Sequence, residues 1–228
     1  VDSAIGGKVG VNHTLGKNLI GAFYPPASVL IDPELLTTLP RREFRAGLYE
    51  VIKYGMIADR DLFERVERDL SALFDHNQMA LQPIIAECCR IKSSIVETDE
   101  REAGLRRILN FGHTVGHAIE AVTKYRRFKH GEAVGYGMLA AADIAVRRRT
   151  LAPEPRKALS ELVTKLGPMP SVADLSSKQV IDMINRDKKI KEGKLHFVLP
   201  SSIGTTIVVD DVTTRQINAA LKRLGLRP

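Results

Sequence analysis

Two histidines stand one helical turn apart in the segment NFGHTVGH. His113 and His117 are four residues apart, a spacing that places both imidazoles on one face of a helix. Imidazole nitrogens are common ligands of zinc. The residue after His113 is threonine, so the pair does not form the His-Glu-x-x-His pattern of zinc proteases. By itself the pair is consistent with a metal site or with an exposed helix face.

A third imidazole and a carboxylate extend the metal hypothesis. His130 opens the segment HGEAV, and Glu50 lies among apolar neighbours in RAGLYEVIKYG. An unpaired buried carboxylate is costly, so we expect Glu50 to have a partner. Two imidazoles and one carboxylate form a catalytic zinc set that leaves one coordination position open. Spacing alone favours the alternative, an ion pair between Glu50 and Lys53 three residues on.

Basic residues occur in and around the same segments. Arg can bind a phosphate or carboxylate through two hydrogen bonds, whereas Lys acts as a point charge. Each of them alone is more typical of a solvated surface, but together they suit an anionic substrate. The residues concerned are Lys8, Lys17, Lys53, Lys92 and Arg106.

The composition is that of a soluble globular protein, with 44% hydrophobic and 27% charged residues among 228. Apolar runs fall short of the ~20 residues that a membrane helix needs, and residues 1–5 lack the features of a secretion signal. The adjacent Cys88 and Cys89 do not suit a disulfide, which favours a reducing cytoplasm. The net charge of +7 is scattered without interleaved aromatic residues, so we expect no nucleic-acid partner.

These residues must be positioned by a mainly helical chain. Apolar side chains recur at helical spacing most clearly in residues 78–99. Residues 1–24 are rich in glycine and predict turns and loops, the β-branched run at 28–32 predicts a strand, and residues 200–204 predict a hairpin turn. The predicted helices are 41–57, 60–74, 78–99, 106–122, 130–149, 154–166, 177–186 and 212–224, and the predicted hairpin strands are 195–199 and 205–209.

A single strand cannot bury one face of a sheet. Residues 1–38 are therefore expected to be the last strand and loops of an α/β domain whose earlier strands are not in this chain. Residues 39–228 are expected to form a helical domain with a small β-hairpin, which carries the candidate metal and anion ligands.

Four segments resemble the dehydroquinate synthase family, in that family's order and spacing. They are VDSAIGGK with the glycine-rich stretch to Gly21, RAGLYEVIKYG, LNFGH with the following Gly116 and His117, and HGEAV. The resemblance fades after residue 205. It implies a metal- and NAD-dependent lyase of the shikimate pathway, which converts 3-deoxy-D-arabino-heptulosonate 7-phosphate to 3-dehydroquinate and phosphate. It also implies a cytoplasmic homodimer that binds a small anionic sugar phosphate.

The resemblance assigns roles to individual residues. The metal ligands, for zinc or cobalt, fall on Glu50, His113 and His130. The catalytic candidates are His117, Lys53 and Asn110, and His117 suits proton handling because an imidazole titrates near neutral pH. The NAD contacts fall on Lys8, Lys17, Leu35, Leu36, Thr37 and Thr38. The substrate contacts fall on Asp2, Lys8, Asn18, Lys53, Lys92, Arg106, Asn110 and His117, and on Lys188 or Lys189.

Two departures from the family pattern stand out. Val9 replaces a usual threonine, which we expect to be tolerated. No strand–Gly-x-Gly-x-x-Gly–helix unit occurs in the sequence, and the family's pyrophosphate loop is expected upstream, so this chain alone should bind NAD poorly.

Several alternatives remain open. Other sugar-phosphate cyclases share the metal ligands, and polyol dehydrogenases of the superfamily tend to use aspartate where Glu50 stands. The chain also suits a folded helical module without catalysis. A basic nucleic-acid binder would show binding that falls steeply with salt.

Overall fold

The structure is a computed structural model that describes residues 1–228 except 14–15, 101, 103 and 191–194. The side chains of residues 8, 12–13, 16–19 and 187–190 also lie outside the described part. The predictions for Lys8, Lys17, Asn18, Lys188 and Lys189 therefore fall outside the described residues.

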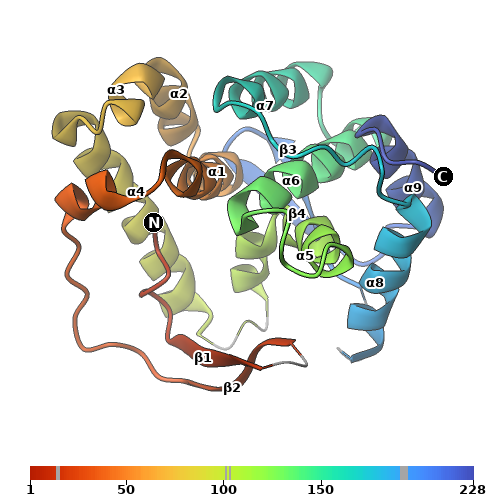
Figure 1. Cartoon of the computed structure of the whole chain (residues 1–228), viewed down its shortest axis with the longest axis horizontal. Helices are drawn as coiled ribbons and strands as arrows, with labels where there is room; N and C mark the ends of the chain where they lie inside the picture. The colour runs from red at the N-terminus through yellow and green to blue at the C-terminus, as the bar shows by residue number, and fades with distance from the viewer. Residues whose placement is uncertain (14–15, 101, 103, 191–194) are drawn as a thin grey trace.

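The predicted helical body is confirmed (Figure 1). Its centre is formed by α1 (Arg41–Ala58) and α6 (His130–Arg147), with α5 (His113–Val122) packed against α6. Large side chains of α1, among them Tyr49, Ile52 and Met56, are fully buried there. The other helices are α2 (Arg60–Arg68), α3 (Leu70–Phe74), α4 (Gln78–Thr98), α7 (Pro153–Lys165), α8 (Ser177–Ile190) and α9 (Thr214–Arg223).

Two predicted helices are divided. The segment 60–74 breaks at Asp69, between α2 and α3. The segment 106–122 becomes a 3-10 helix, η2 (Leu105–Asn110), followed by α5. The break comes at Gly112, whose φ of +80° is a left-handed conformation that side chains other than glycine resist. A Cβ there would also lie 2.7 Å from the Val134 carbonyl oxygen, so this position fixes where α5 begins.

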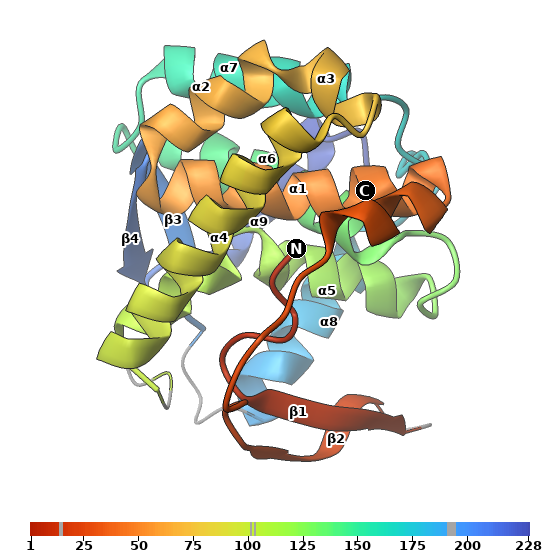
Figure 2. The same cartoon turned by 90° about the vertical axis from the view of Figure 1, so that its left-hand side faces the viewer.

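The N-terminal residues form a hairpin rather than the predicted turns and loops. Strands β1 (Lys8–His13) and β2 (Gly16–Phe23) pair antiparallel, with Gly10 opposite Gly21. The hairpin projects from one side of the helical body (Figure 2). The predicted strand at 28–32 is wrong. This segment forms no strand, because no neighbouring strand in the described chain pairs with its backbone, and the Leu30 side chain is 95% exposed.

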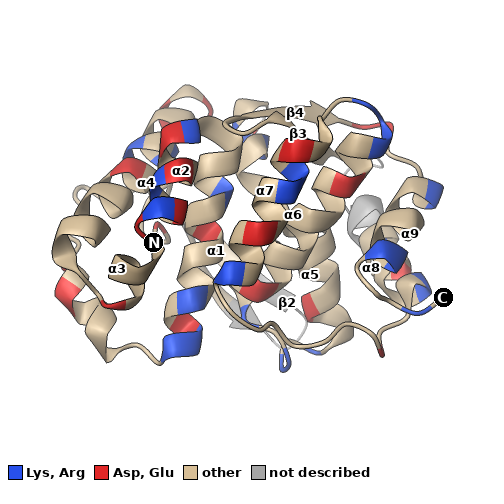
Figure 3. Ribbon diagram, turned by 90° about the horizontal axis from the view of Figure 1, so that it is seen from above, with Lys and Arg blue, Asp and Glu red and all other residues tan. Residues whose placement is uncertain are grey.

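The predicted second hairpin is confirmed, in strands β3 (Phe197–Ser202) and β4 (Thr205–Val209). A further 3-10 helix, η1 (Pro33–Thr38), leads from residues 28–32 to α1. None of the described helices combines the length and apolarity needed to cross a bilayer. Lys and Arg interleave with Asp and Glu along α2 and α7 (Figure 3), a pattern typical of a solvated helix face.

Candidate metal and substrate site

The predicted metal ligands converge from three helices. Glu50 lies in the middle of α1, His113 begins α5 and His130 begins α6. The Glu50 Oε1 atom lies 3.7 Å from His113 Nε2 and 3.6 Å from His130 Nε2. Segments 63 and 80 residues distant from Glu50 in the chain thus present ligand atoms to one point.

The two carboxylate oxygens of Glu50 have different surroundings, and the predicted ion pair with Lys53 is present on one of them. Oε2 accepts a hydrogen bond of 2.7 Å from Lys53 Nζ, while Oε1 is buried and has no hydrogen-bond partner. Burial raises the pKa of Glu50, but the charges of Lys53, His113 and His130 outweigh it and hold this pKa well below its usual range. Burial lowers the pKa of His113 to about 3. At neutral pH the site therefore offers an anionic carboxylate and a neutral imidazole, the states that bind metal.

A divalent metal ion fits among these atoms. Zinc lies about 2.0–2.2 Å from nitrogen and oxygen ligands in a tetrahedral arrangement, so two ligand atoms of one ion are about 3.4 Å apart. The separations of 3.6 and 3.7 Å from Glu50 Oε1 are close to that value. The buried Oε1 atom without a hydrogen bond is the atom that a metal would satisfy.

Both imidazoles direct Nε2 toward Glu50. Nδ1 of His113 lies 3.1 Å from the Phe111 carbonyl oxygen, and Nδ1 of His130 lies 3.0 Å from Glu120 Oε2. A carbonyl oxygen can only accept, so Nδ1 of His113 carries the hydrogen and Nε2 keeps the lone pair that binds metal.

His117 lies on the next turn of α5 and is exposed. Nitrogen atoms of His113, His117 and His130 lie within 4.8 Å of one another, so three imidazoles are an alternative ligand set. Glu50 is the alternative third candidate, because its Oε1 is buried without a hydrogen bond. The His117 ring lies 5.2 Å from that of His113 and 5.6 Å from that of His130, so His117 would lie beside a metal held by Glu50 and these two histidines.

A pocket of about 470 Å³ opens beside the three ligands. Its wall includes five of the predicted substrate residues, Asp2, Lys53, Lys92, Arg106 and Asn110. His117 and the predicted NAD contacts Leu35, Leu36, Thr37 and Thr38 are not among the lining residues described. The latter four lie on η1, where the hydroxyls of Thr37 and Thr38 bond the carbonyls of Glu34 and Leu35 at 2.7 Å.

The basic residues of the pocket are held by short contacts. Lys92 Nζ lies 2.8 Å from both the carboxylate and the carbonyl oxygen of Asp2. Arg106 is 2% exposed and donates to the carbonyl of Gly6 at 2.7 Å. Burial raises the pKa of Asp2, but the charges of Lys53 and Lys92 lower it by more, so the net pKa is below its usual value and this carboxylate stays charged. The N-terminal residues thereby form one wall of the pocket.

Sequence reasoning missed two pocket residues that hold others in place. Tyr54 is fully buried and its hydroxyl bonds the Asp2 carboxylate. Glu102 accepts a hydrogen bond from Asn110. Tyr54 lies in the RAGLYEVIKYG segment, but a tyrosine among apolar residues predicts a core position, so nothing in the pattern pointed to this contact.

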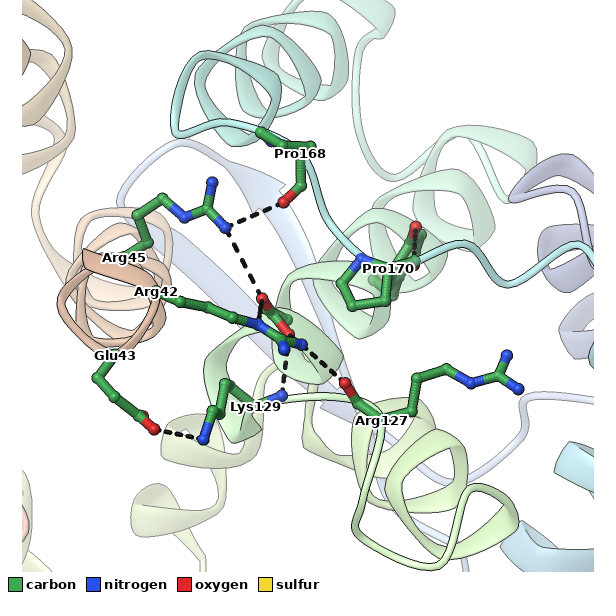
Figure 4. Close-up of polar contacts among 9 residues, drawn as sticks. Arg42, Glu43, Arg45, Arg127, Lys129, Pro168 and Pro170 are labelled. Carbon is green, nitrogen blue, oxygen red and sulfur yellow. Dashed lines mark hydrogen bonds and ion pairs between the residues drawn. The ribbon is translucent and has the colours of Figure 1, made fainter. Parts of the chain in front are cut away.

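The start of α6, which carries His130, is anchored to α1 by a buried carboxylate (Figure 4). Glu132 is 1% exposed and accepts two hydrogen bonds of 2.7 Å from Arg42. It also accepts from the backbone nitrogen of Lys129 at 2.9 Å, the contact of a capping box. Arg42 reaches on to the carbonyl of Arg127. A glutamate at the third helical position was the sequence signal for this contact.

Known proteins share these segments. A profile described as 3-dehydroquinate synthase C-terminal matches residues 47–190, and one described as 3-dehydroquinate synthase N-terminal matches residues 1–46. The chain is 49% identical over 224 residues to a 3-dehydroquinate synthase of Rippkaea orientalis, with 97% of this chain and 61% of that protein covered. Identity is also 49% to the enzyme named so in a Nostoc species, with 98% and 62% covered. The chain therefore spans about three-fifths of the length of these relatives.

Two solved structures of cyclases resemble the fold. The first is 2-epi-5-epi-valiolone synthase of Streptomyces hygroscopicus with NAD+ and Zn2+ bound, at a TM-score of 0.88 and 29% identity over 98% of this chain and 62% of that one. The second is 2-deoxy-scyllo-inosose synthase with carbaglucose-6-phosphate, NAD+ and Co2+, at a TM-score of 0.83 and 30% identity over 97% and 63%.

Proposed function

Because the chain belongs to the 3-dehydroquinate synthase family, we propose that it forms the metal- and substrate-binding part of a lyase that converts 3-deoxy-D-arabino-heptulosonate 7-phosphate to 3-dehydroquinate and phosphate. The observation that carries the proposal is the meeting of Glu50, His113 and His130 beside a pocket lined by cationic side chains. The relatives at 46–49% identity bear this enzyme's name.

The metal ligands in this proposal are Glu50, His113 and His130, and the metal is zinc or cobalt, as in the two similar structures. When bound, it would supply a Lewis acid for the hydroxyl and ketone oxygens of the substrate. Lys53, Lys92 and Arg106 bring positive charge to the pocket wall, which suits a substrate that carries both a phosphate and a carboxylate. Asn110 would bind a substrate hydroxyl, and His117 would exchange protons at the exposed side of the centre.

NAD is the proposed second cofactor, because the two similar structures contain it, and it would carry the hydride that no side chain can carry. Among the described residues no glycine-rich loop links a strand to a helix to bind the pyrophosphate. Leu35, Thr37 and Thr38 are exposed on η1, whereas Leu36 packs against the core. We therefore expect this chain alone to bind NAD weakly. The family also leads us to propose a cytoplasmic homodimer.

A zinc titration with two matched variants tests the metal site. We expect about one zinc ion per chain, lost in Glu50→Gln. Glu43→Gln is the control, because Glu43 lies on the same helix and lines the same pocket but pairs with Lys129. Equal zinc binding by wild type and Glu50→Gln, with loss in His117→Ala, would assign the site to the three imidazoles and refute the proposed ligand set.

A second candidate is a cyclase for a different sugar phosphate, which both similar structures favour. Calorimetry on the zinc-loaded chain distinguishes the two. The heptulosonate 7-phosphate carries a carboxylate that glucose 6-phosphate lacks, so the proposed enzyme binds the former more tightly, and Lys92→Met weakens this binding. Equal affinity for both sugars would favour the second candidate.

A further inference from the structure

One face of α5 carries three polar side chains in a row. His113, His117 and Glu120 stand at positions i, i+4 and i+7 of the helix, a spacing that aligns them along one side. The first is a proposed metal ligand. The third is 2% exposed, and its Oε2 atom lies 3.0 Å from Nδ1 of His130, the ligand on α6. The same helix face therefore supplies one ligand and contacts another.

We propose that Glu120 is a positioning residue that fixes the orientation of His130 for metal binding. This inference rests on the metal site proposed above. A carboxylate next to Nδ1 holds the hydrogen on that nitrogen, which leaves the lone pair on Nε2. Nε2 of His130 is the atom that faces Glu50 Oε1 at 3.6 Å.

The surroundings of Glu120 and His130 explain why their contact should affect metal binding. The His130 side chain is 42% exposed, so without Glu120 its ring has an open side toward which it can turn. The Glu120 carboxylate is buried, where a charge interacts more strongly than in water. His113 has only a neutral carbonyl in the same role. Carboxylate partners of metal-bound histidines orient the ring and make the nitrogen more basic.

The test compares three variants of the chain by zinc competition against a chelator. We expect Glu120→Ala to weaken zinc binding by about 10- to 100-fold. Glu120→Gln keeps an oxygen that accepts from Nδ1 and should retain part of the affinity. The control is Asp143→Asn. Asp143 is also a buried carboxylate, but it lies on α6 and pairs with Arg156 at 2.7 Å. This substitution should lower thermal stability and leave the zinc affinity unchanged.

The visible absorption spectrum of bound cobalt gives a second measurement, which does not change when the protein only loses stability. Glu120→Gln and Glu120→Ala should shift the visible bands of bound cobalt, because the ligand field of His130 changes, whereas Asp143→Asn should not. Wild-type zinc affinity and an unchanged cobalt spectrum in both Glu120 variants would overturn the positioning role and leave the metal site intact. Absence of zinc and cobalt binding in the wild type would instead overturn the site and the inference together.

Discussion

A methyl group at Gly131 should separate the two helices that carry the metal ligands. Gly131 follows His130 at the start of α6, where a Cβ atom would lie 1.9 Å from the carbonyl oxygen of Ala46 on α1. Real Cβ atoms stay at least 3.0 Å from such atoms, so α1 and α6 must move apart by about 1.1 Å in Gly131→Ala. Overpacking of this kind costs about 1–3 kcal/mol.

The matched control is Gly47→Ala, the next position on α1. A Cβ there meets nothing within 4 Å, and alanine favours a helix by about 1 kcal/mol over glycine. The two substitutions add the same methyl group and should shift the thermal midpoint in opposite directions, by about 2–4 °C for each kcal/mol in a chain of this size.

Zinc affinity gives the second assay. A movement of 1.1 Å exceeds the tolerance of about 0.2 Å in metal–ligand distances, so Gly131→Ala should lose on the order of tenfold or more of its zinc affinity. Calorimetric melting and zinc competition on both variants measure the two effects. An unchanged midpoint and unchanged zinc affinity in Gly131→Ala would refute the close approach of α1 and α6 at the site.

Further predictions concern the contacts around the pocket. Arg42→Met removes the shorter ion pair of buried Glu132 and leaves only the one of 4.0 Å with Arg45. Because the Arg42 side chain is 42% exposed, we expect a loss of about 1–3 kcal/mol in urea unfolding, partly recovered by adding Glu132→Gln, and no loss would contradict the anchoring role. Tyr54→Phe removes the hydroxyl that bonds Asp2 and should cost about 1 kcal/mol, seen as a lower urea midpoint. Burial and the charge of Asp2 raise the pKa of Cys88, so at pH 8 its thiolate is scarce, and iodoacetamide should label it only on unfolding; rapid native labelling would refute its burial. Removal of zinc with a chelator should cost about 2.7 kcal/mol relative to protein held at 100 times the zinc Kd, measured by thermal melting, and Glu50→Gln should show no such difference.

The sequence predicted the helices because apolar residues repeat at a period that only a packed helix satisfies. It also predicted the second hairpin, whose turn contains Gly204, although Pro200 lies within strand β3 rather than in the predicted turn. It missed strands β1 and β2, and it was wrong for the strand at residues 28–32. The β-branched run at 28–32 has strand propensity, but a strand forms only where another strand supplies hydrogen bonds. Those bonds were available to the glycine-rich residues of β1 and β2.

For the site, residue type and the family resemblance nominated Glu50, His113 and His130, but could not decide between a metal ligand and an ion pair with Lys53. That choice depends on which groups approach each carboxylate oxygen, and the two histidines come from helices 63 and 80 residues away in the chain. The contacts of Glu120 with His130 and of Tyr54 with Asp2 likewise join separate segments. A sequence pattern records spacing within one element, whereas these partners are set by how the elements pack, and only the tertiary structure decides that.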